Sequence, residues 1–121
     1  MSFVLLWAGV GVLGGLGAIA RFLIDTAISS RAGGRLPLGT LAVNLSGSLL
    51  LGVLVGAALK GDSLLLVGTA VLGSYTTFST WMYETNRLAE DGQHRVLRAN
   101  LIASLVLGVA GAELGRLLGG A

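Results

Sequence analysis

Four long stretches of apolar residues run along the 121-residue chain, separated by short polar segments. A helix needs about 20 mainly apolar residues to cross the roughly 30 Å hydrocarbon core of a bilayer, and each stretch reaches that length. The pattern therefore predicts an all-α integral membrane protein, built as one domain of four transmembrane helices. These helices are predicted at about residues 3–28, 38–59, 63–86 and 97–118.

Small residues recur four positions apart within these stretches. In lipid, such spacing lets two helix backbones approach closely, so it predicts a tightly packed bundle without indicating what the bundle does. The recurring sets are Gly11 with Gly15, then Ser48 with Gly52 and Gly56, and Ser104 with Gly108 and Ala112.

Composition agrees with a membrane protein. Apolar residues make up 54% of the chain and charged residues only 12%, about half the charged share of a soluble domain. Cysteine is absent and the formal charge is only +2, so neither a disulfide framework nor nucleic-acid binding is indicated. The sequence has no nucleophile–base pair, metal-ligand cluster or phosphate loop, and we expect no enzymatic activity. Residues 9–14 fit a dinucleotide fingerprint, but they lie inside an apolar helix rather than after a strand.

The middle of the third stretch is unusually rich in hydroxyl groups. Residues 73–80 read GSYTTFST, and six of the seven residues after Gly73 carry a hydroxyl. One interpretation is a continuous helix whose hydroxyls bond to carbonyls one turn earlier. The other is a broken helix, which lipid tolerates only where the unwound backbone is buried in protein or lines a polar cavity. A break would offer free carbonyls to a cation and helix N–H groups to an anion without any charged side chain.

Two further stretches carry amides within apolar sequence. Asn44 lies four residues before Ser48, and Asn100 lies four residues before Ser104, so each pair shares one face of a helix. A buried amide is costly unless it is hydrogen-bonded, so each asparagine either bonds a neighbouring helix or contributes to a polar track. Such a track of neutral donors suits a small, strongly hydrated anion.

Aromatic and charged residues flank the hydroxyl-rich segment. Phe78 and Trp81 could contact an anion through their positive ring edges or a cation through their faces, and sequence alone leaves the ring orientation open. Arg21 and Glu84 are the charges nearest the membrane and could simply reach the interface or pair there. Glu113 and Arg116 are spaced for a surface ion pair.

These segments resemble the bacterial Fluc (CrcB) fluoride channel family. The similarity rests on residues 14–21 (GGLGAIAR), on residues 36–44 (LPLGTLAVN) with Gly47, and on residues 73–80 followed by Glu84. It covers three helices in order, with the third motif highly specific. The fourth helix matches mainly in length and in its polar face.

The resemblance implies an antiparallel, dual-topology dimer with two pores that conduct fluoride passively, in the membrane of a prokaryote. It implies a structural sodium ion at the dimer centre, held by the backbone carbonyls of Gly73 and Thr76. It places Asn44 and Phe78 in the anion pore. Two positions depart from the family pattern: the second pore phenylalanine is Trp81, and the fourth-helix pore tyrosine corresponds to Asn100. The full set expected along the pore is Asn44, Phe78, Ser79, Thr80, Trp81 and Ser104, with Arg21 and Glu84 as further candidates.

Charge asymmetry bears on the dimer. Five arginines flank one side of the predicted bundle and two basic residues flank the other, which favours the first side facing the cytoplasm with both termini outside. That bias leaves two alternatives, an antiparallel homodimer or pairing with an oppositely oriented homologue. The first side carries Arg31, Arg35, Arg87, Arg95 and Arg98, and the second carries Lys60 and Arg116.

Two other functions fit a short four-helix membrane protein. A small multidrug exporter would need an acidic residue in the first helix, where the only candidate is Asp25 near the end. A non-transporting scaffold would use the glycines for packing alone. Measurement of ion flux from reconstituted liposomes distinguishes a channel from both of these alternatives.

Overall fold

The computed structural model describes residues 2–32 and 37–120, and every regular element in these two ranges is helical. The predicted all-α class is therefore confirmed for the described part of the chain. The elements, in order, are α1 (Phe3–Ala32), α2 (Leu38–Gly56), η1 (Leu64–Leu72), α3 (Gly73–Tyr75), α4 (Ser79–Glu90) and α5 (His94–Gly120).

Three of these helices, α1, α2 and α5, are long and apolar enough to cross a membrane. α1 extends beyond its expected end at residue 28, α2 stops short of residue 59, and α5 is longer than expected at both ends. The third predicted helix is built from the successive pieces η1, α3 and α4. Large apolar side chains along α1 face outward, including Phe3, Val12 and Phe22. Such a surface suits contact with lipid rather than water.

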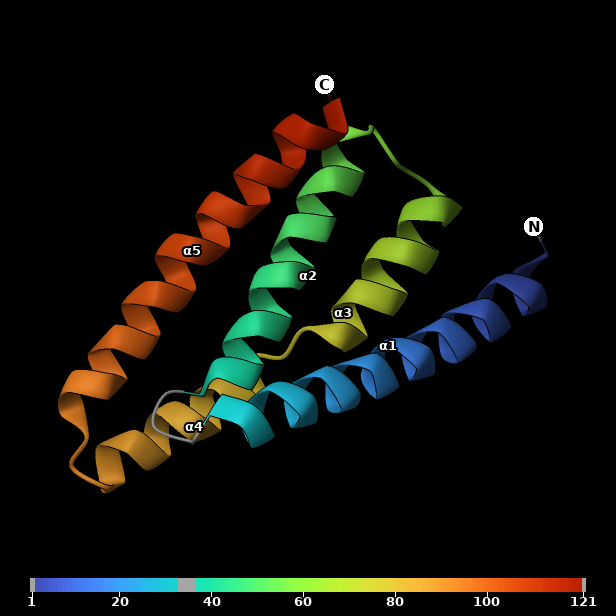
Figure 1. The fold of residues 1–121 in the computed structure, drawn as a ribbon. Coiled ribbons are helices and arrows are strands. Elements are labelled where there is room, and N and C mark those ends of the chain that lie inside the picture. The colour runs from blue at the N-terminus through green and yellow to red at the C-terminus, as the bar shows by residue number, and fades with distance from the viewer. Residues whose placement is uncertain (1, 33–36, 121) are drawn as a thin grey trace.

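The helices form an open bundle (Figure 1). α2 packs against α5 along one flank, and η1 and α3 pack against α1 along the other. α4 lies at the lower end of the view, where it contacts α5 and α2. Both ends of the described chain lie toward the upper part of the view, as does the α2–η1 connection, whereas the α4–α5 turn lies at the opposite end.

Glycines allow α2 and α5 to pack with their backbones in contact. A Cβ atom at Gly52 would overlap the carbonyl oxygen of Ala112, and one at Gly115 would overlap that of Leu49. The close packing predicted from small residues is thus confirmed for this pair of helices. By contrast, a Cβ atom added at Gly11 or Gly15 on α1 would meet no side chain or neighbouring helix within 4 Å in the described structure.

We expect Gly115→Val to prevent stable packing of α2 on α5, because the added atoms would meet backbone that cannot rotate away. Overpacking of this kind typically costs about 1–3 kcal/mol. The loss is measurable as a lower thermal midpoint in detergent. Gly11→Val, on a face with no neighbour in the described structure, is the matched control within one subunit. Equal thermal midpoints for Gly115→Val and wild type would contradict the packing described above.

The third segment is broken at the hydroxyl-rich stretch. α3 ends at Tyr75, Thr76 is extended with φ −80° and ψ 161°, and α4 begins at Ser79. The predicted break is confirmed, and the alternative of a continuous helix is wrong. Thr76 does bond through Oγ1 to the Leu72 carbonyl oxygen at 2.9 Å, as that alternative expected of hydroxyls. One such bond does not keep the following backbone helical.

The segment before the break is wound more loosely than an α-helix. η1 is a π-helix, and the Gly73 N–H bonds to the Gly68 carbonyl five residues back. π-helical turns are rare in proteins overall, and those that occur are often found at functional sites. The unwound stretch therefore follows directly on backbone that already departs from regular α-helical winding.

Candidate functional site

Asn44 holds the broken backbone through both ends of its side-chain amide. Its Nδ2 donates to the Thr77 carbonyl oxygen at 2.9 Å, and its Oδ1 accepts from the Thr77 N–H at 2.8 Å. The amide thus pairs with Thr77 much as a neighbouring strand would pair with an extended residue. The Asn44 amide is half-buried, and its hydrogen bonds are satisfied by the break itself.

This pairing leaves two backbone carbonyls without their helical donors. In a continuous helix, the N–H groups of Thr77 and Thr80 would bond to the carbonyls of Gly73 and Thr76. Instead, the Thr77 N–H bonds to Asn44 and the Thr80 N–H bonds to the Thr77 Oγ1 at 3.2 Å. Gly73 and Thr76 are the residues that the family resemblance assigned to sodium. Carbonyl oxygens are suitable ligands for a hard cation, so the donors present fit that ion.

Two further contacts fix the backbone around the break to α2. The Ser46 Oγ lies 2.8 Å from the hydroxyl oxygen of Tyr75, the buried last residue of α3. Gly47 approaches Thr76 so closely that an added Cβ would overlap the threonine methyl group. Asn44 and Gly47 are one helical turn apart, so one face of α2 contacts both Thr76 and Thr77.

The start of α4 points its N–H groups toward the break. Thr77 Oγ1 caps the Thr80 N–H, as a side-chain oxygen before a helix commonly does. The N-terminal end of a helix carries a partial positive charge, which favours a nearby anion. The break therefore combines free carbonyls, suited to a cation, with a helix N-terminus, suited to an anion.

A cavity of about 560 Å³ lies beside the break. Its polar lining comes from α2, η1 and the unwound stretch, and includes Asn44, Ser48 and Thr69. Gly73 and Thr76 also line it. The cavity therefore brings together the asparagine and both residues expected at the sodium site.

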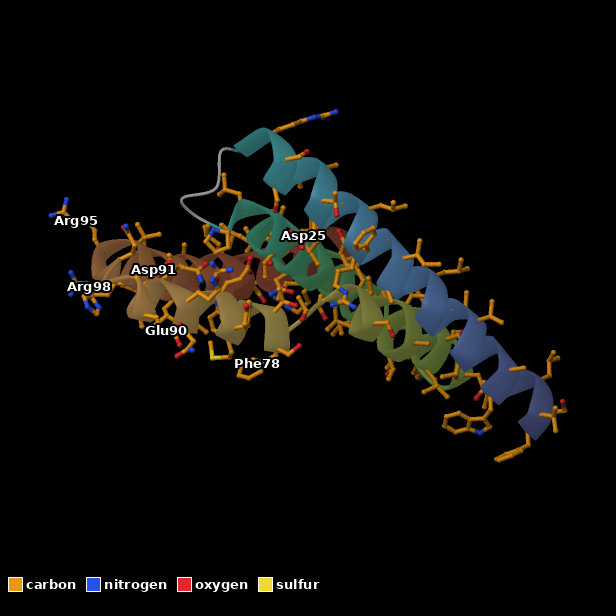
Figure 2. The ribbon with its side chains drawn as sticks, turned by 90° about the horizontal axis from the view of Figure 1, so that it is seen from below. Asp25, Phe78, Glu90, Asp91, Arg95 and Arg98 are labelled. Atoms are coloured by element: carbon orange, nitrogen blue, oxygen red, sulfur yellow. The ribbon has the colours of Figure 1, made fainter. Side chains whose placement is uncertain are left out.

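The two aromatic residues after the break also line this cavity. Their rings are T-shaped, with centroids 5.7 Å apart and planes at 70°. Phe78 is 69% exposed, and Figure 2 shows its ring directed away from the ribbon. The Trp81 Nε1 is buried and has no hydrogen-bond partner among the described residues. The two rings thus lie edge to face against each other, and both residues line the cavity.

A second cavity of about 220 Å³ reaches the break between α1 and α2. It contains one cation and one carboxylate, Arg21 and Asp25, together with Thr40 and Thr80. Thr77 lines both cavities. The unwound stretch therefore borders the smaller, charged cavity as well as the larger, neutral one.

Three predicted residues line neither cavity. Ser79 is exposed, with its Oγ 3.5 Å from the Thr77 Oγ1. Ser104 is half-buried on α5 and lines neither cavity, and Glu84 is half-buried on α4. Glu84 Oε1 is buried with no hydrogen-bond partner among the described residues. The predicted Glu113–Arg116 pair is present, with Arg116 Nε donating to Glu113 Oε2 at 2.8 Å.

Sequence reasoning missed the part that Thr77 and Gly47 play. Thr77 was one hydroxyl among six, and its importance comes from its backbone N–H and carbonyl, which no composition pattern identifies. The spacing of Gly47 three residues after Asn44 is a usable signal in retrospect, because a glycine one turn from a buried amide permits close approach of another backbone.

Comparison with known proteins identifies relatives along nearly the whole chain. The family described as "CrcB-like protein, Camphor Resistance (CrcB)" matches residues 8–116. A protein of Mycolicibacterium paratuberculosis named fluoride-specific ion channel FluC 2 is 52% identical over 118 residues, covering 98% of this chain and 97% of the relative. The protein of the same name from Mycobacterium tuberculosis H37Rv is 50% identical, covering 93% and 90%. Fluoride-specific ion channel FluC 1 of Symbiobacterium thermophilum is 42% identical, covering 93% and 96%.

Proposed function

The chain belongs to the CrcB family, and from that premise we propose that it is a fluoride channel that conducts the ion passively out of the cell. Relatives over almost its full length are named fluoride-specific ion channels. It is a multi-pass membrane protein of prokaryotic type and acts as a transporter rather than an enzyme. Its place is the inner, cytoplasmic membrane.

One structural observation supports this function most strongly. The third segment unwinds at Thr76–Phe78, within a stretch that has no Lys, Arg, Asp or Glu between Ser63 and Tyr83. The unwound backbone borders a cavity on each side. Neutral dipoles and ring edges can replace the water shell of a small anion without trapping it, as a passive channel requires.

The direct test is ion efflux from liposomes that contain the purified protein. We expect rapid fluoride efflux, read with a fluoride electrode, and retention of chloride under the same gradient. Liposomes without protein give the background. Chloride efflux at a rate comparable with fluoride would contradict the proposed selectivity, and the absence of fluoride efflux would contradict the function.

The proposed pore includes Asn44, Phe78, Trp81 and Thr80, with Ser79 and Ser104 at its margins. Asn44 and the two aromatic residues share the larger cavity, and Thr80 lines the smaller one. Arg21 stands in the smaller cavity, where its charge would attract an anion toward the break. Glu84 lies one turn beyond Thr80 on α4.

We also propose a structural sodium ion held by the carbonyls of Gly73 and Thr76. Two oxygens are too few for a cation, which typically takes about six. Two copies of the chain related by a twofold axis would double the number. Flux that is unchanged when sodium is replaced by a large organic cation during purification and assay would argue against this ion.

The functional unit is proposed to be an antiparallel dimer of dual topology with two pores. One subunit exposes both the larger cavity and the apolar face of α1, so a partner is needed to separate an ion from lipid. The partner is a second copy or an oppositely oriented homologue. Reporter fusions that place every copy in one orientation would rule out the homodimer.

The excess of basic residues at one end of the bundle is also found among the described residues. Arg87, Arg95 and Arg98 lie in α4 and α5 near the turn between them, and Arg95 and Arg98 extend from that end in Figure 2. Lys60 lies in the connection at the opposite end. Arg35 lies outside the described residues. The end with the arginines is proposed to face the cytoplasm in the favoured orientation.

The multidrug-exporter alternative depended on Asp25. In the structure its Oδ1 accepts a hydrogen bond from the Ser29 hydroxyl at 3.0 Å. It lies near the end of α1 and lines the smaller cavity, as Arg21 does. A cavity that also holds an arginine is a poor site for a cationic drug. The scaffold alternative would not need a break bordered by two cavities.

A further inference from the structure

Asn100 is among the most deeply buried polar side chains in the described structure. It is 1% exposed, on the second turn of α5, and lines neither of the two cavities beside the break. The resemblance placed it at a pore tyrosine, but its surroundings here are protein rather than an open passage. Asn100 therefore needs another explanation than direct contact with an ion.

Asn100 is the first member of a hydrogen-bonded chain that ends at Trp81. Its Nδ2 donates to the Thr85 Oγ1 at 3.1 Å, and that hydroxyl donates to the Trp81 carbonyl oxygen at 2.7 Å. Thr85 is 9% exposed. The chain links α5 to the first turn of α4, at the residue that carries the cavity-lining indole.

These two bonds together fix the orientation of the Thr85 hydroxyl group. It accepts from Asn100 and therefore directs its own proton to the Trp81 carbonyl, and bonds in such a series strengthen one another. A threonine bonded to the carbonyl one turn earlier also tends to bend its helix. Asn100 thus controls a bond that sets the geometry of α4 at Trp81.

The stability of the fold does not by itself explain an amide at this position. Asn100 Oδ1 is buried without a hydrogen-bond partner among the described residues, and an unpaired buried acceptor is unfavourable. Leucine has a similar volume and would avoid that cost. Without Asn100, the Thr85 hydroxyl would lose the donor that orients its proton toward the Trp81 carbonyl oxygen. An amide that costs stability and touches no cavity is therefore best explained by what it holds in place.

We propose that Asn100 is a positioning residue that acts through Thr85 to fix Trp81 at the cavity opposite Phe78. The aromatic pair is then held from two sides. Asn44 of α2 fixes the backbone next to Phe78 through Thr77, and Asn100 of α5 fixes the backbone at Trp81. This inference rests on the proposed function, because it assigns the two departures from the family pattern a joint role in anion selection.

The test uses Trp81 as its own reporter. The chain contains two tryptophans, and Trp7→Phe leaves Trp81 as the only indole. In that background we compare Asn100→Leu and Thr85→Val with Thr85→Ser, which keeps the hydroxyl and is the matched control. Each protein is checked for assembly by size exclusion and then measured in liposomes for Trp81 quenching by acrylamide and for fluoride efflux.

We expect Asn100→Leu and Thr85→Val each to change Trp81 quenching and to lower fluoride efflux about twofold to tenfold, the range for loss of one hydrogen bond. The double variant should be no worse than either single variant, because both residues act in one chain. Thr85→Ser should behave as the parent. If Asn100→Leu fails to assemble, Thr85→Val must give the Trp81 change by itself.

Reduced efflux with unchanged Trp81 quenching would overturn the inference, because Asn100 would then act on the ion path directly. Unchanged quenching and efflux in both variants would also overturn it. A parent protein that shows no fluoride efflux, but whose Trp81 still responds to Asn100→Leu, would contradict the proposed function and leave the positioning role intact.

Discussion

Replacing Asn44 by leucine is expected to reduce fluoride efflux about tenfold to a hundredfold while the subunit still folds. The leucine removes both hydrogen bonds that hold Thr77, at 2.9 and 2.8 Å. Each bond contributes about 0.5–1.5 kcal/mol, and every 1.4 kcal/mol corresponds to a factor of ten. The unwound stretch would then sample other conformations, and the cavity would lose its amide.

The loss of support for the unwound stretch can be measured directly as the rate of amide hydrogen exchange at Thr77. In the wild type this N–H is bonded to Asn44 Oδ1, so exchange should accelerate in Asn44→Leu. Asn44→Asp keeps an acceptor for the N–H but adds a negative charge to the cavity. We expect it to retain much of the protection while still losing fluoride efflux, because like charges repel.

Ser48→Ala is the control for these variants. Ser48 lines the same cavity one turn further along α2, and it makes no hydrogen bond among those found in the described residues. Its efflux should stay within about twofold of wild type, since no hydrogen bond is removed. Wild-type efflux from Asn44→Leu would show that the broken backbone needs no support from α2.

Replacing Phe78 by leucine should lower fluoride efflux about tenfold or more and reduce its selectivity over chloride. Leucine keeps the apolar volume of the side chain but has no aromatic quadrupole, so it cannot present a positive ring edge to an anion. It also removes the T-shaped partner of Trp81, which stands 5.7 Å away between centroids. The exposed position of Phe78 means that folding should be little affected.

Phe3→Leu is the matched control, because it makes the same change at a residue that is also highly exposed. It lies at the start of α1, away from both cavities. The ratio of fluoride to chloride efflux is the quantity to compare. An unchanged ratio in Phe78→Leu would exclude the ring from the step that selects the ion.

The break itself could be predicted from sequence because its cause is local. Hydroxyl-bearing residues after Gly73 are poor helix formers and need polar surroundings in a membrane. The partner that stabilises the break could not be predicted, since Asn44 and Thr77 are 33 positions apart. Helical periodicity predicts which residues share a face, but it does not predict which neighbouring helix that face contacts.

Because sequence does not predict which neighbouring helix a face contacts, it also did not predict the environments of the polar residues on α5. Asn100 and Ser104 share a face with Gly108, and this periodicity left open either a bond to a neighbouring helix or a polar track. In the structure, Asn100 bonds to α4, whereas Ser104 lines neither cavity. The glycines of α5 decide this arrangement by packing closely on α2, for example Gly115 against Leu49. Backbone contact, rather than polar pattern, sets the rotation of the helix.

The loose winding of η1 was equally beyond sequence reasoning. Residues 64–72 read LLLVGTAVL and are apolar on nearly every side. Such a segment carries no periodic signal that distinguishes a π-helix from an α-helix. Its length and hydropathy predicted a helix, and only the structure shows its winding, in a segment that packs against α1 and α2.

Fluoride is proposed to pass the broken helix through the cavity that Asn44 and Phe78 line. The chain has no cysteine, so a single cysteine at Ser48 can be labelled selectively with a bulky thiol reagent. We predict that Ser48→Cys conducts fluoride before labelling and stops after it. Val109→Cys, on the exposed surface of α5, should conduct before and after. Full labelling of Ser48→Cys with undiminished fluoride efflux would show that fluoride does not pass through this cavity.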